Sequence, residues 1–293
     1  MENGVCINEK ELTIGILYIC TGRYRVFWPG FYKTMNKYFF PESQRKIFLF
    51  SDNPLEYFIE SAEITDSSDI VYTHIENKPW PFVTLLRYQL FVEHSDKWSG
   101  CDYIFFINGD YNFYQRIGKE ILPSSDECGL VVAEHQKSLD LPPEEYPYER
   151  NPSSQAYIPV GVGKHYFAGG FNGGKTEDFL KLCKEIDNAT QTDLDNGIIA
   201  IWHDESQLNA RLLHRNVKVL PPWYVWPSFW NKRKNRHLVV AGPVDKLQYG
   251  GYDWLRGATD KKLKSKFLRR LPRYIIMLCF ALVLILLCYY LLI

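Results

Sequence analysis

Residues 102–111 read DYIFFINGDY, a short apolar run that passes directly into a turn carrying an amide, a glycine and a carboxylate. Short runs of β-branched and aromatic residues bounded by turn residues predict buried strands. Gly109 permits a tight turn, and Asn108 and Asp110 place oxygen atoms at the end of the predicted strand. Such oxygens could hold a divalent cation against a pyrophosphate. An ordinary turn that closes a strand is the alternative.

Other segments extend this pattern along the chain. Further β-rich runs cover residues 14–19, 45–50, 129–133 and 217–220, and helical stretches cover residues 28–38, 82–99, 176–189 and 204–213. This alternation predicts an α/β fold with a mixed, mainly parallel sheet flanked by helices. Ligands of such sheets bind beyond the carboxyl ends of the strands, which draws attention to residues 20–22 and 108–110. Residues 141–156, rich in Pro, Glu and Ser, predict a long surface loop.

Charge is unevenly distributed along the chain. It has 34 basic and 34 acidic residues in 293, but seven of the basic residues lie within 261–273 and no acidic residue follows Asp260. The first 260 residues therefore carry a net charge of −7, which argues against a general nucleic-acid-binding function. The seven cysteines are scattered without a C-x-x-C pair. They favour reduced thiols in a cytoplasmic compartment over a disulfide framework or a zinc site.

The last 20 residues, 274–293, contain no charged side chain. As a helix they would span roughly 30 Å, about one hydrocarbon core, and they lack the polar face of a surface helix. The basic flank fits a cytoplasmic membrane face. We therefore expect a catalytic domain over residues 1–258, a basic juxtamembrane linker over 259–273 and a transmembrane helix over 274–293. This single-pass C-terminal anchor would contact membrane lipid and hold the catalytic domain in the cytoplasm; a buried core helix is the alternative.

Two further segments could carry chemistry. Residues 202–209, WHDESQLN, open a predicted helix with an aromatic side chain, an imidazole and two adjacent carboxylates. A carboxylate beneath the anomeric carbon of a sugar could stabilise positive charge there or attack that carbon, and a plain helix cap is the alternative. Residues 168–174, AGGFNGG, contain four glycines. They permit close approach of the backbone to a ligand; a flexible loop is the alternative, and the ending of a phosphate-binding P-loop is missing.

These segments in this order resemble glycosyltransferase family 6. The motifs are ILYICTGRY (16–24), KPWPFVTLLRYQLF (78–91), the strand ending in NGD, YERNPSSQAYIP (148–159), YFAGGFNGG (166–174) and IWHDESQLN (201–209). The family contains the mammalian histo-blood-group A and B transferases, the α-1,3-galactosyltransferase and shorter bacterial members, which this chain resembles most. The resemblance spans residues 14–256 and implies a GT-A type nucleotide-sugar-binding fold.

The resemblance also implies a set of donor-binding residues. The uridine pocket would be lined by Ile19, Cys20, Thr21 and Tyr24. Further donor contacts would come from Trp80, Arg87, Asn108, Asp110, Ala168, Gly169, Gly170, Asp204, Lys246 and Arg256. In the family, the positions of Ala168 and Gly170 select between galactose and N-acetylgalactosamine. Lys246 and Arg256 would reach the pyrophosphate.

On the acceptor side, the resemblance implies contacts from His135, Trp202 and Glu205. Glu205 would lie beneath the anomeric carbon and be the catalytic residue, while Asp204 would bind hydroxyl groups of the donor. The implied reaction retains the anomeric configuration and forms an α-1,3 linkage to a galactose-type glycan acceptor, either with or without fucose. The donor would be UDP-N-acetylgalactosamine or UDP-galactose, and the small side chains at Ala168 and Gly170 favour the former.

Two departures from the family pattern affect these expectations. Asn108 replaces the first acid of the family's D-x-D motif, whereas Asp110 keeps the second. One carboxylate and one amide are a weak ligand set for a hard cation. The sequence therefore predicts no obligatory cofactor, with Mn²⁺ held by Asp110 and Asn108 as the alternative. Residues 136–146 do not match the family run that follows the histidine, which leaves the choice of acceptor open.

Two other functions stay open at this point. A catalytically idle, membrane-anchored protein that binds UDP-sugar or carbohydrate is favoured by the missing carboxylate at Asn108, whereas the intact WHDES motif argues against it. A nucleotidyltransferase would need a pair of carboxylates at the strand end to hold Mg²⁺, and only Asp110 is acidic there.

Overall fold

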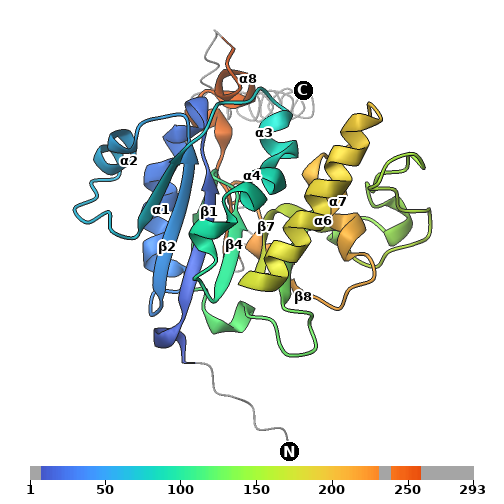
Figure 1. Cartoon of the computed structure of the whole chain (residues 1–293), viewed down its shortest axis with the longest axis horizontal. Coiled ribbons are helices and arrows are strands. Elements are labelled where there is room, and N and C mark those ends of the chain that lie inside the picture. The colour runs from blue at the N-terminus through green and yellow to red at the C-terminus, as the bar shows by residue number, and fades with distance from the viewer. Residues whose placement is uncertain (1–7, 231–238, 259–293) are drawn as a thin grey trace, which may run out of the picture. The chain divides into compact units, whose positions relative to one another are not determined.

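The computed structural model describes residues 8–230 and 239–258 (Figure 1). It divides into two compact units, Met1–Val244 and Asp245–Ile293. In the first unit the strands are β1 (Thr13–Ile19), β2 (Gln44–Ser51), β3 (Ile70–His74), β4 (Tyr103–Ile107), β5 (Tyr111–Phe113), β6 (Leu130–Glu134), β7 (Phe167–Lys175), β8 (Lys218–Leu220) and β9 (Ala241–Pro243). Its α-helices are α1 (Trp28–Tyr38), α2 (Leu55–Ser61), α3 (Phe82–Leu85), α4 (Arg87–Glu93), α5 (Ser95–Trp98), α6 (Thr176–Asp195) and α7 (Asp204–Leu212). The second unit contains a 3₁₀ helix, Lys246–Tyr249, and α8 (Gly251–Leu255).

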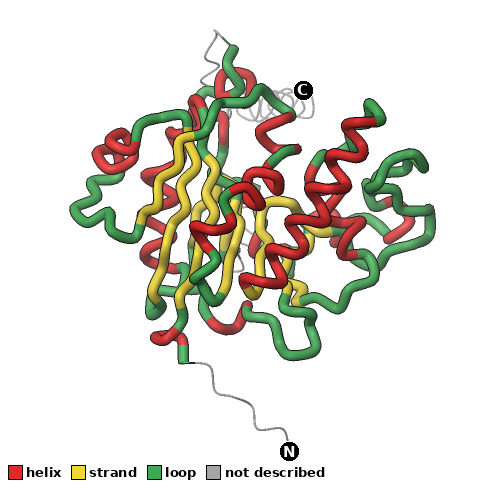
Figure 2. Tube along the Cα trace, in the orientation of Figure 1, coloured by secondary structure: helices red, strands yellow, loops and turns green. Residues whose placement is uncertain are grey.

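A seven-stranded sheet organises the described part of the first unit, in the order β3-β2-β1-β4-β7-β6-β8, and β5 pairs with β9 beside it. β1 is parallel to β2 and β4, β2 to β3, and β6 to β8, while β7 is antiparallel to both of its neighbours. Helices cover both faces of the sheet (Figure 2). The predicted α/β fold with a mixed, mainly parallel sheet is confirmed, and it fits a GT-A type architecture.

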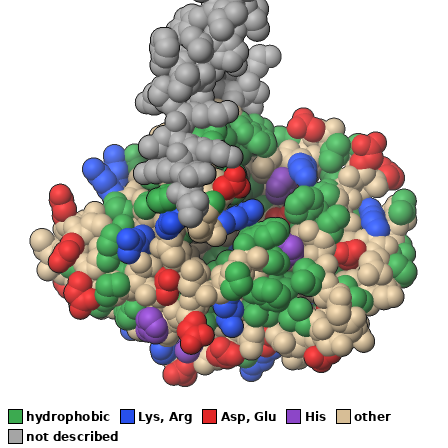
Figure 3. All heavy atoms as spheres, turned by 90° about the horizontal axis from the view of Figure 1, so that it is seen from above, with side chains coloured by type: hydrophobic (Ala, Val, Ile, Leu, Met, Phe, Trp, Pro, Cys, Tyr) green, Lys and Arg blue, Asp and Glu red, His purple; other side chains and the backbone are tan. Residues whose placement is uncertain are grey.

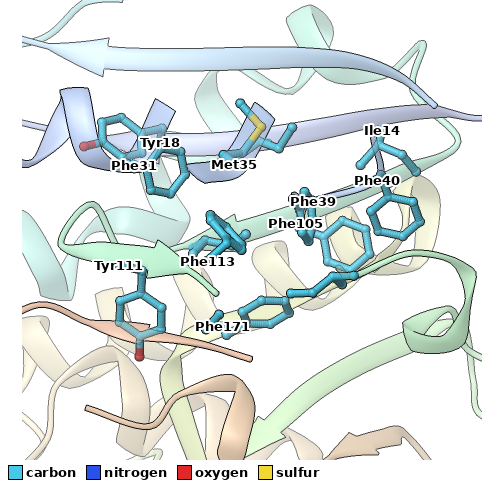
Figure 4. Packing of buried hydrophobic residues seen from close by; sticks show 14 of the residues in the cluster. Ile14, Tyr18, Phe31, Met35, Phe39, Phe40, Phe105, Tyr111, Phe113 and Phe171 are labelled. Atoms are coloured by element: carbon cyan, nitrogen blue, oxygen red, sulfur yellow. The ribbon is translucent and has the colours of Figure 1, made fainter. Parts of the chain in front are cut away.

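The sheet is buried on both faces, which explains why its strands read as continuous apolar runs. In β1, Ile16 and Tyr18 face a cluster that includes α1, whereas Leu17 faces a cluster that includes α4 and α6. The first cluster is strongly aromatic: Figure 4 shows Phe39, Phe105 and Phe171 among its members. Phe39 meets Phe105 edge to face with ring centroids 5.4 Å apart, a geometry that aromatic pairs prefer.

The helices follow the expected apolar spacing. α6 buries Phe179, Leu182, Cys183 and Ile186, which is the i, i+3, i+4, i+7 pattern of one helix face. The single helix predicted over residues 82–99 is instead divided into α3, α4 and α5. The division places Arg87 at the beginning of α4.

The glycine-rich segment AGGFNGG is neither a flexible loop nor an open ligand loop but most of strand β7, with residues 167–174 buried. Its glycines allow neighbouring strands to approach closely. A Cβ atom added at Gly173 would lie 2.2 Å from the carbonyl oxygen of Ile104 in β4. Alternating hydrophobicity does not reveal this strand, because glycine occupies the positions where large apolar residues would normally stand.

Residues 141–156, predicted as a surface loop, form irregular chain with a short 3₁₀ turn at Pro143–Glu145. Much of this chain is nevertheless internal. Tyr146 and Tyr148 are buried in a small cluster with Ile158 and Tyr166. This aromatic cluster packs next to the candidate active site described below.

The predicted membrane association is corrected. Across residues 8–230 and 239–258, no helix is both long and apolar enough to cross a bilayer; the 20-residue α6 is amphipathic, with charged side chains on its exposed face. The predicted basic linker (259–273) and transmembrane helix (274–293) lie outside the described residues. We therefore withdraw the prediction of a single-pass anchor that contacts lipid and holds the catalytic domain in the cytoplasm. The predicted domain boundaries stay untested predictions.

Candidate active site

The carboxylate of Glu205 is held at both oxygens in the first turn of α7. Oε1 accepts a hydrogen bond from the Tyr166 hydroxyl at 2.5 Å. Oε2 accepts one from the backbone N–H of Gly169 in β7 at 2.8 Å. Burial first, and then the neighbouring Glu205, raises the pKa of Tyr166 well above its ordinary value, so Tyr166 remains a proton donor. The arrangement fixes the direction of the carboxylate before any ligand binds.

The chain enters α7 through an unusual backbone conformation. His203, the residue before the helix, has φ 54° and ψ −122° and makes no side-chain cap. Positive φ at a non-glycine residue costs of order 1–3 kcal/mol and needs support from its surroundings. The N–H of Trp202 donates to Ser206 Oγ at 3.1 Å, and the N–H of Glu205 donates to the carbonyl of Trp202 at 3.1 Å. The motif is thus more than the plain helix cap considered above.

Asp204 forms a buried ion pair with Arg87. Arg87 Nε lies 3.1 Å from Asp204 Oδ2, and the two side chains are 8% and 3% exposed. The same Nε–H donates to the carbonyl oxygen of Thr84, and Oδ2 accepts no hydrogen bond among the described residues. Burial is the main cause that raises the pKa of Asp204, to about 7, although Arg87 opposes the rise. An oxygen in this state can accept a hydrogen bond from a ligand hydroxyl.

Arg87 also joins the ends of β4 and β7. One terminal nitrogen donates to Asn108 Oδ1 at 3.2 Å and to the carbonyl oxygen of Gly169 at 3.4 Å. The guanidinium carbon lies 4.4 Å from the centroid of the Phe106 ring. The structure thus brings together the predicted donor residues Arg87, Asn108, Gly169 and Asp204. Their predicted contacts with the donor remain untested.

Asn108 and Asp110 lie in the turn between β4 and β5. The N–H of Asn108 donates to the carbonyl of Gly170 at 2.9 Å, and the side chain of Asp110 is buried. Within the described ranges no cluster of three or more His, Cys, Asp or Glu side chains could hold a metal ion. Because the amide oxygen of Asn108 already accepts from a cationic guanidinium, it fits a metal ion poorly.

Strand β7 contains Ala168 and Gly170, the two residues predicted to select the donor, and between them Gly169, a predicted donor contact. Ala168 is buried. A Cβ atom at Gly169 would lie 3.2 Å from Asp204 Oδ2, and one at Gly170 would lie 2.5 Å from the Tyr111 hydroxyl oxygen. Larger side chains at these positions would therefore press directly on the candidate active site.

The predicted acceptor side is formed by His135 and Trp202. His135 Nδ1 accepts from the N–H of Lys137 at 3.1 Å, and burial lowers the pKa of this imidazole. A neutral ring that accepts at Nδ1 carries its proton on Nε2, which can then donate to a ligand. Trp202 is 43% exposed, and Lys137 Nζ lies 5.1 Å from its ring centroid.

Exposed Trp80 lies near the entry to α7, where its ring meets the His203 ring edge to face at a centroid distance of 5.2 Å. Because His203 directly precedes Asp204 in the sequence, the predicted donor residue Trp80 lies near Asp204. Figure 3, a view from above Figure 1, shows hydrophobic side chains gathered beside charged and histidine side chains. Apolar ring faces next to polar groups suit the two-sided character of a sugar.

The predicted uridine residues lie at the end of β1, at Ile19, and in the segment that follows it. Ile19 is partly exposed, Cys20 and Thr21 are buried, and the Tyr24 ring packs against Phe27 at a centroid distance of 5.5 Å. Burial raises the pKa of the Cys20 thiol, so this cysteine is an inert core side chain.

A cavity of about 250 Å³ adjoins this segment. Residues that line it include Ile19, Ile75, Phe82, Val83, Arg87 and Leu90. It therefore connects the predicted uridine pocket at Ile19 with the predicted donor residue Arg87. Most of its wall is apolar, as is usual for a pocket that takes a flat ring.

Lys246 and Arg256 belong to the second unit. Within that unit both flank the ring of Tyr252, with Lys246 Nζ 4.7 Å and the Arg256 guanidinium carbon 5.3 Å from its centroid. The two predicted pyrophosphate ligands therefore share one local cluster, and their role stays a prediction.

Sequence reasoning missed Tyr166, which contacts Glu205 directly. Tyr166 is the first residue of the YFAGGFNGG motif. The motif therefore points to this segment but does not indicate that Tyr166 contacts Glu205. Asn209 was missed as well: its side chain exchanges two hydrogen bonds of 2.8 Å with the backbone of Phe167. This pairing joins α7 to β7 and fixes the spacing between Glu205 and Gly169.

Comparisons with known proteins agree with this geometry. The family model for glycosyltransferase family 6 matches residues 5–246. An O-antigen biosynthesis glycosyltransferase of Escherichia coli is 29% identical over 82% of this chain and 98% of its own. Globoside alpha-1,3-N-acetylgalactosaminyltransferase 1 of Gallus gallus is 31% identical over 80% of this chain and 68% of its own. Histo-blood group ABO system transferase 1 of Rattus norvegicus is 33% identical over 74% and 62%, respectively. The resemblance seen in the sequence is confirmed, and the chain belongs to glycosyltransferase family 6.

Proposed function

We propose that this glycosyltransferase transfers N-acetylgalactosamine, or galactose, from its UDP-sugar in α-1,3 linkage with retention of anomeric configuration. The acceptor is a galactose-type, fucosylated glycan. The observation that supports the proposal is the carboxylate of Glu205, which hydrogen bonds from Tyr166 and Gly169 hold in place. Two relatives, an alpha-1,3-N-acetylgalactosaminyltransferase and an ABO transferase, support the same reaction class.

In the proposed reaction the bond between the anomeric carbon and the UDP oxygen breaks, and positive charge develops on the sugar. The carboxylate of Glu205 stabilises that charge or forms a short-lived covalent adduct. The acceptor 3-hydroxyl oxygen forms the new bond to the anomeric carbon, and its proton passes to the departing phosphate oxygen. His135 and Trp202 are proposed to contact and orient the acceptor.

Asp204 is proposed to bind donor hydroxyls. Its Oδ2 is buried and accepts no hydrogen bond within the described residues, so a donor hydroxyl would satisfy it. Because unsatisfied buried acceptors are costly, a sugar that places a hydroxyl here gains affinity over one that does not. Ala168 and Gly170 are small at the two positions that select the donor sugar in the family, which favours N-acetylgalactosamine over galactose.

The leaving group is proposed to depart without an obligatory metal ion. Arg87 supplies a buried positive charge at the end of β4, where it already contacts Asn108. Lys246 and Arg256 are proposed to add charge at the pyrophosphate. The apolar cavity next to Ile19 and Arg87 supports a nucleobase in the same neighbourhood. Mn²⁺ bound by Asp110 with Asn108 is the alternative.

The test is transfer by the full-length chain with UDP-N-acetylgalactosamine or UDP-galactose and fucosyl-α-1,2-galactose, with and without EDTA. Product mass identifies the donor, and the proton coupling at the new anomeric centre identifies the linkage as α or β. We expect an α-linked product that survives EDTA. Product lost with EDTA and restored by Mn²⁺ would overturn the metal-independent part. UDP binding without transfer or donor hydrolysis would support the idle binder that Asn108 favours.

A further inference from the structure

The motif YERNPSSQAYIP is one of the segments that carry the resemblance to glycosyltransferase family 6. None of its residues, however, takes part in the proposed chemistry. Its one acidic residue, Glu149, is 7% exposed and accepts two hydrogen bonds from the backbone. Oε1 accepts from the N–H of Asn151 at 2.8 Å, and Oε2 accepts from the N–H of Ile201 at 2.7 Å. The second bond crosses from the motif to the segment that leads into α7. A buried carboxylate that accepts two N–H groups is strongly held, because hydrogen bonds to charged groups are the stronger ones.

A second buried carboxylate ties the same two segments together. Asp193, near the end of α6, accepts from the Ser154 hydroxyl and the Gln155 N–H, each at 2.7 Å. It also accepts from the Gln207 side chain in α7 at 2.7 Å, and its carbonyl oxygen accepts from the N–H of Ile198 at 2.8 Å. The motif is thus fastened to α6, to α7 and to the chain between them.

The segment held in this way is the one that needs support. Ile201 is followed by Trp202, the predicted acceptor platform, and by His203 with its positive φ of 54°. Ile201 and Trp202 are 56% and 43% exposed, so side-chain packing alone does little to fix them. The hydrogen bond from the N–H of Ile201 to Glu149 holds this segment in place.

We infer that Glu149 is a positioning residue, which fixes the segment 199–203 and thereby orients Trp202 for the acceptor. The inference rests on the proposed function, since it deepens the acceptor side of the same site. Glu149 touches neither Glu205 nor the cavity next to Ile19 and Arg87. Its loss should therefore impair acceptor recognition far more than donor recognition.

The chain offers a matched control for a buried carboxylate that holds a loop. Glu9 is 9% exposed, and its oxygens accept from Arg116 at 2.6 Å and from the N–H of Lys119 at 2.6 Å. It precedes β1, at the amino end of a strand whose carboxyl end leads to the candidate site. Glu9→Gln should lower stability in the same manner as Glu149→Gln without affecting acceptor recognition.

The experiment compares wild type, Glu149→Gln and Glu9→Gln with UDP-N-acetylgalactosamine and fucosyl-α-1,2-galactose. A glutamine can accept only one of the two N–H groups, so we expect the acceptor KM of Glu149→Gln to rise about tenfold or more, which is ~1.4 kcal/mol. The donor KM should be unchanged, and Glu9→Gln should leave both values as in wild type. An unchanged acceptor KM in Glu149→Gln, or an equal rise in Glu9→Gln, would overturn the inference.

A second measurement does not depend on turnover. Hydrogen exchange in the wild type should protect the Ile201 amide as well as the amides inside α7, although the Ile201 side chain is exposed. In Glu149→Gln that protection should fall across residues 199–203 and not in β1. An Ile201 amide that exchanges in wild type like an open loop would show that Glu149 does not hold this segment. Wild type that transfers no sugar would refute the proposed function instead, with the exchange result still deciding on Glu149.

Discussion

Replacing Asp204 by asparagine should change how the stability of the protein depends on pH. In the folded protein Asp204 is fully internal beside Arg87, and burial raises its pKa from 3.8 to about 7. In the unfolded chain the carboxyl titrates near its ordinary value. Between these two pKa values the folded state therefore holds a proton that the unfolded state releases. Stability contributed by this group is complete below about pH 4 and is lost as the pH rises to about 7.

The size of the effect follows from the difference between the two pKa values. Each unit corresponds to about 1.4 kcal/mol, so about three units correspond to about 4 kcal/mol over the whole window. Between about pH 5 and pH 8 the loss is about 3 kcal/mol, and above that range the curve is flat. An asparagine side chain at this position cannot ionise, so the variant should lack this contribution, and its stability relative to wild type should increase with pH.

Urea denaturation of wild type and Asp204→Asn in steps from about pH 5 to pH 8 measures the difference directly. The difference between the two free energies of unfolding should change by about 3 kcal/mol in favour of the variant. A difference that stays constant across this range would refute the reasoning, because it would mean that burial does not raise the pKa of Asp204. The same constant difference is expected if Arg87 dominates and holds the carboxyl ionised, because both pKa values would then lie below pH 5.

Three further outcomes are expected. Arg87→Met should destabilise the protein by about 3–5 kcal/mol in urea denaturation, because it leaves Asp204 buried without its cation. Adding Asp204→Asn to this variant should restore much of the lost stability. If the effects of the two substitutions on the free energy of unfolding simply add, the ion pair is contradicted. Gly173→Ala should prevent folding or lower the thermal midpoint sharply, since the new Cβ would lie 2.2 Å from the Ile104 carbonyl oxygen; a midpoint like that of wild type would contradict the close approach of β7 to β4. Removal of metal ions by EDTA should leave turnover unchanged, whereas a loss reversed by Mn²⁺ would assign a cation to Asp110.

Much of the fold could be predicted from apolar runs and their spacing. The strands near residues 14–19 and 102–107 and the helix at residues 28–38 carry strong patterns, because both faces of the sheet and one face of the helix are buried. β7 could not be predicted in this way. Its glycines are needed because β4 lies too close for a larger side chain. This constraint comes from the tertiary structure, so it leaves no periodic pattern of apolar residues in the sequence. The helix predicted over residues 82–99 is interrupted at Leu86 and His94, and its apolar spacing does not indicate these breaks.

The sequence predicts a set of site residues, whose roles stay predictions, but it does not predict the contacts between them. The turn after β4 and the WHDES segment each had an ordinary structural explanation, and the sequence alone did not show that they meet. Arg87 makes that connection through contacts with both Asn108 and Asp204. The roles of Tyr166 and Glu149 depend on distances between segments that are far apart in the chain, so no local pattern marks them.

Turnover of Glu205→Gln is the most direct test of the central claim, that this carboxylate acts at the anomeric carbon. Transfer from UDP-N-acetylgalactosamine to fucosyl-α-1,2-galactose would be measured beside UDP affinity by calorimetry. The glutamine keeps the size of the side chain but loses the negative charge, so kcat should fall by about 100-fold or more, while the affinity for UDP is unchanged. Near-normal turnover in Glu205→Gln, with UDP binding intact, would contradict the account.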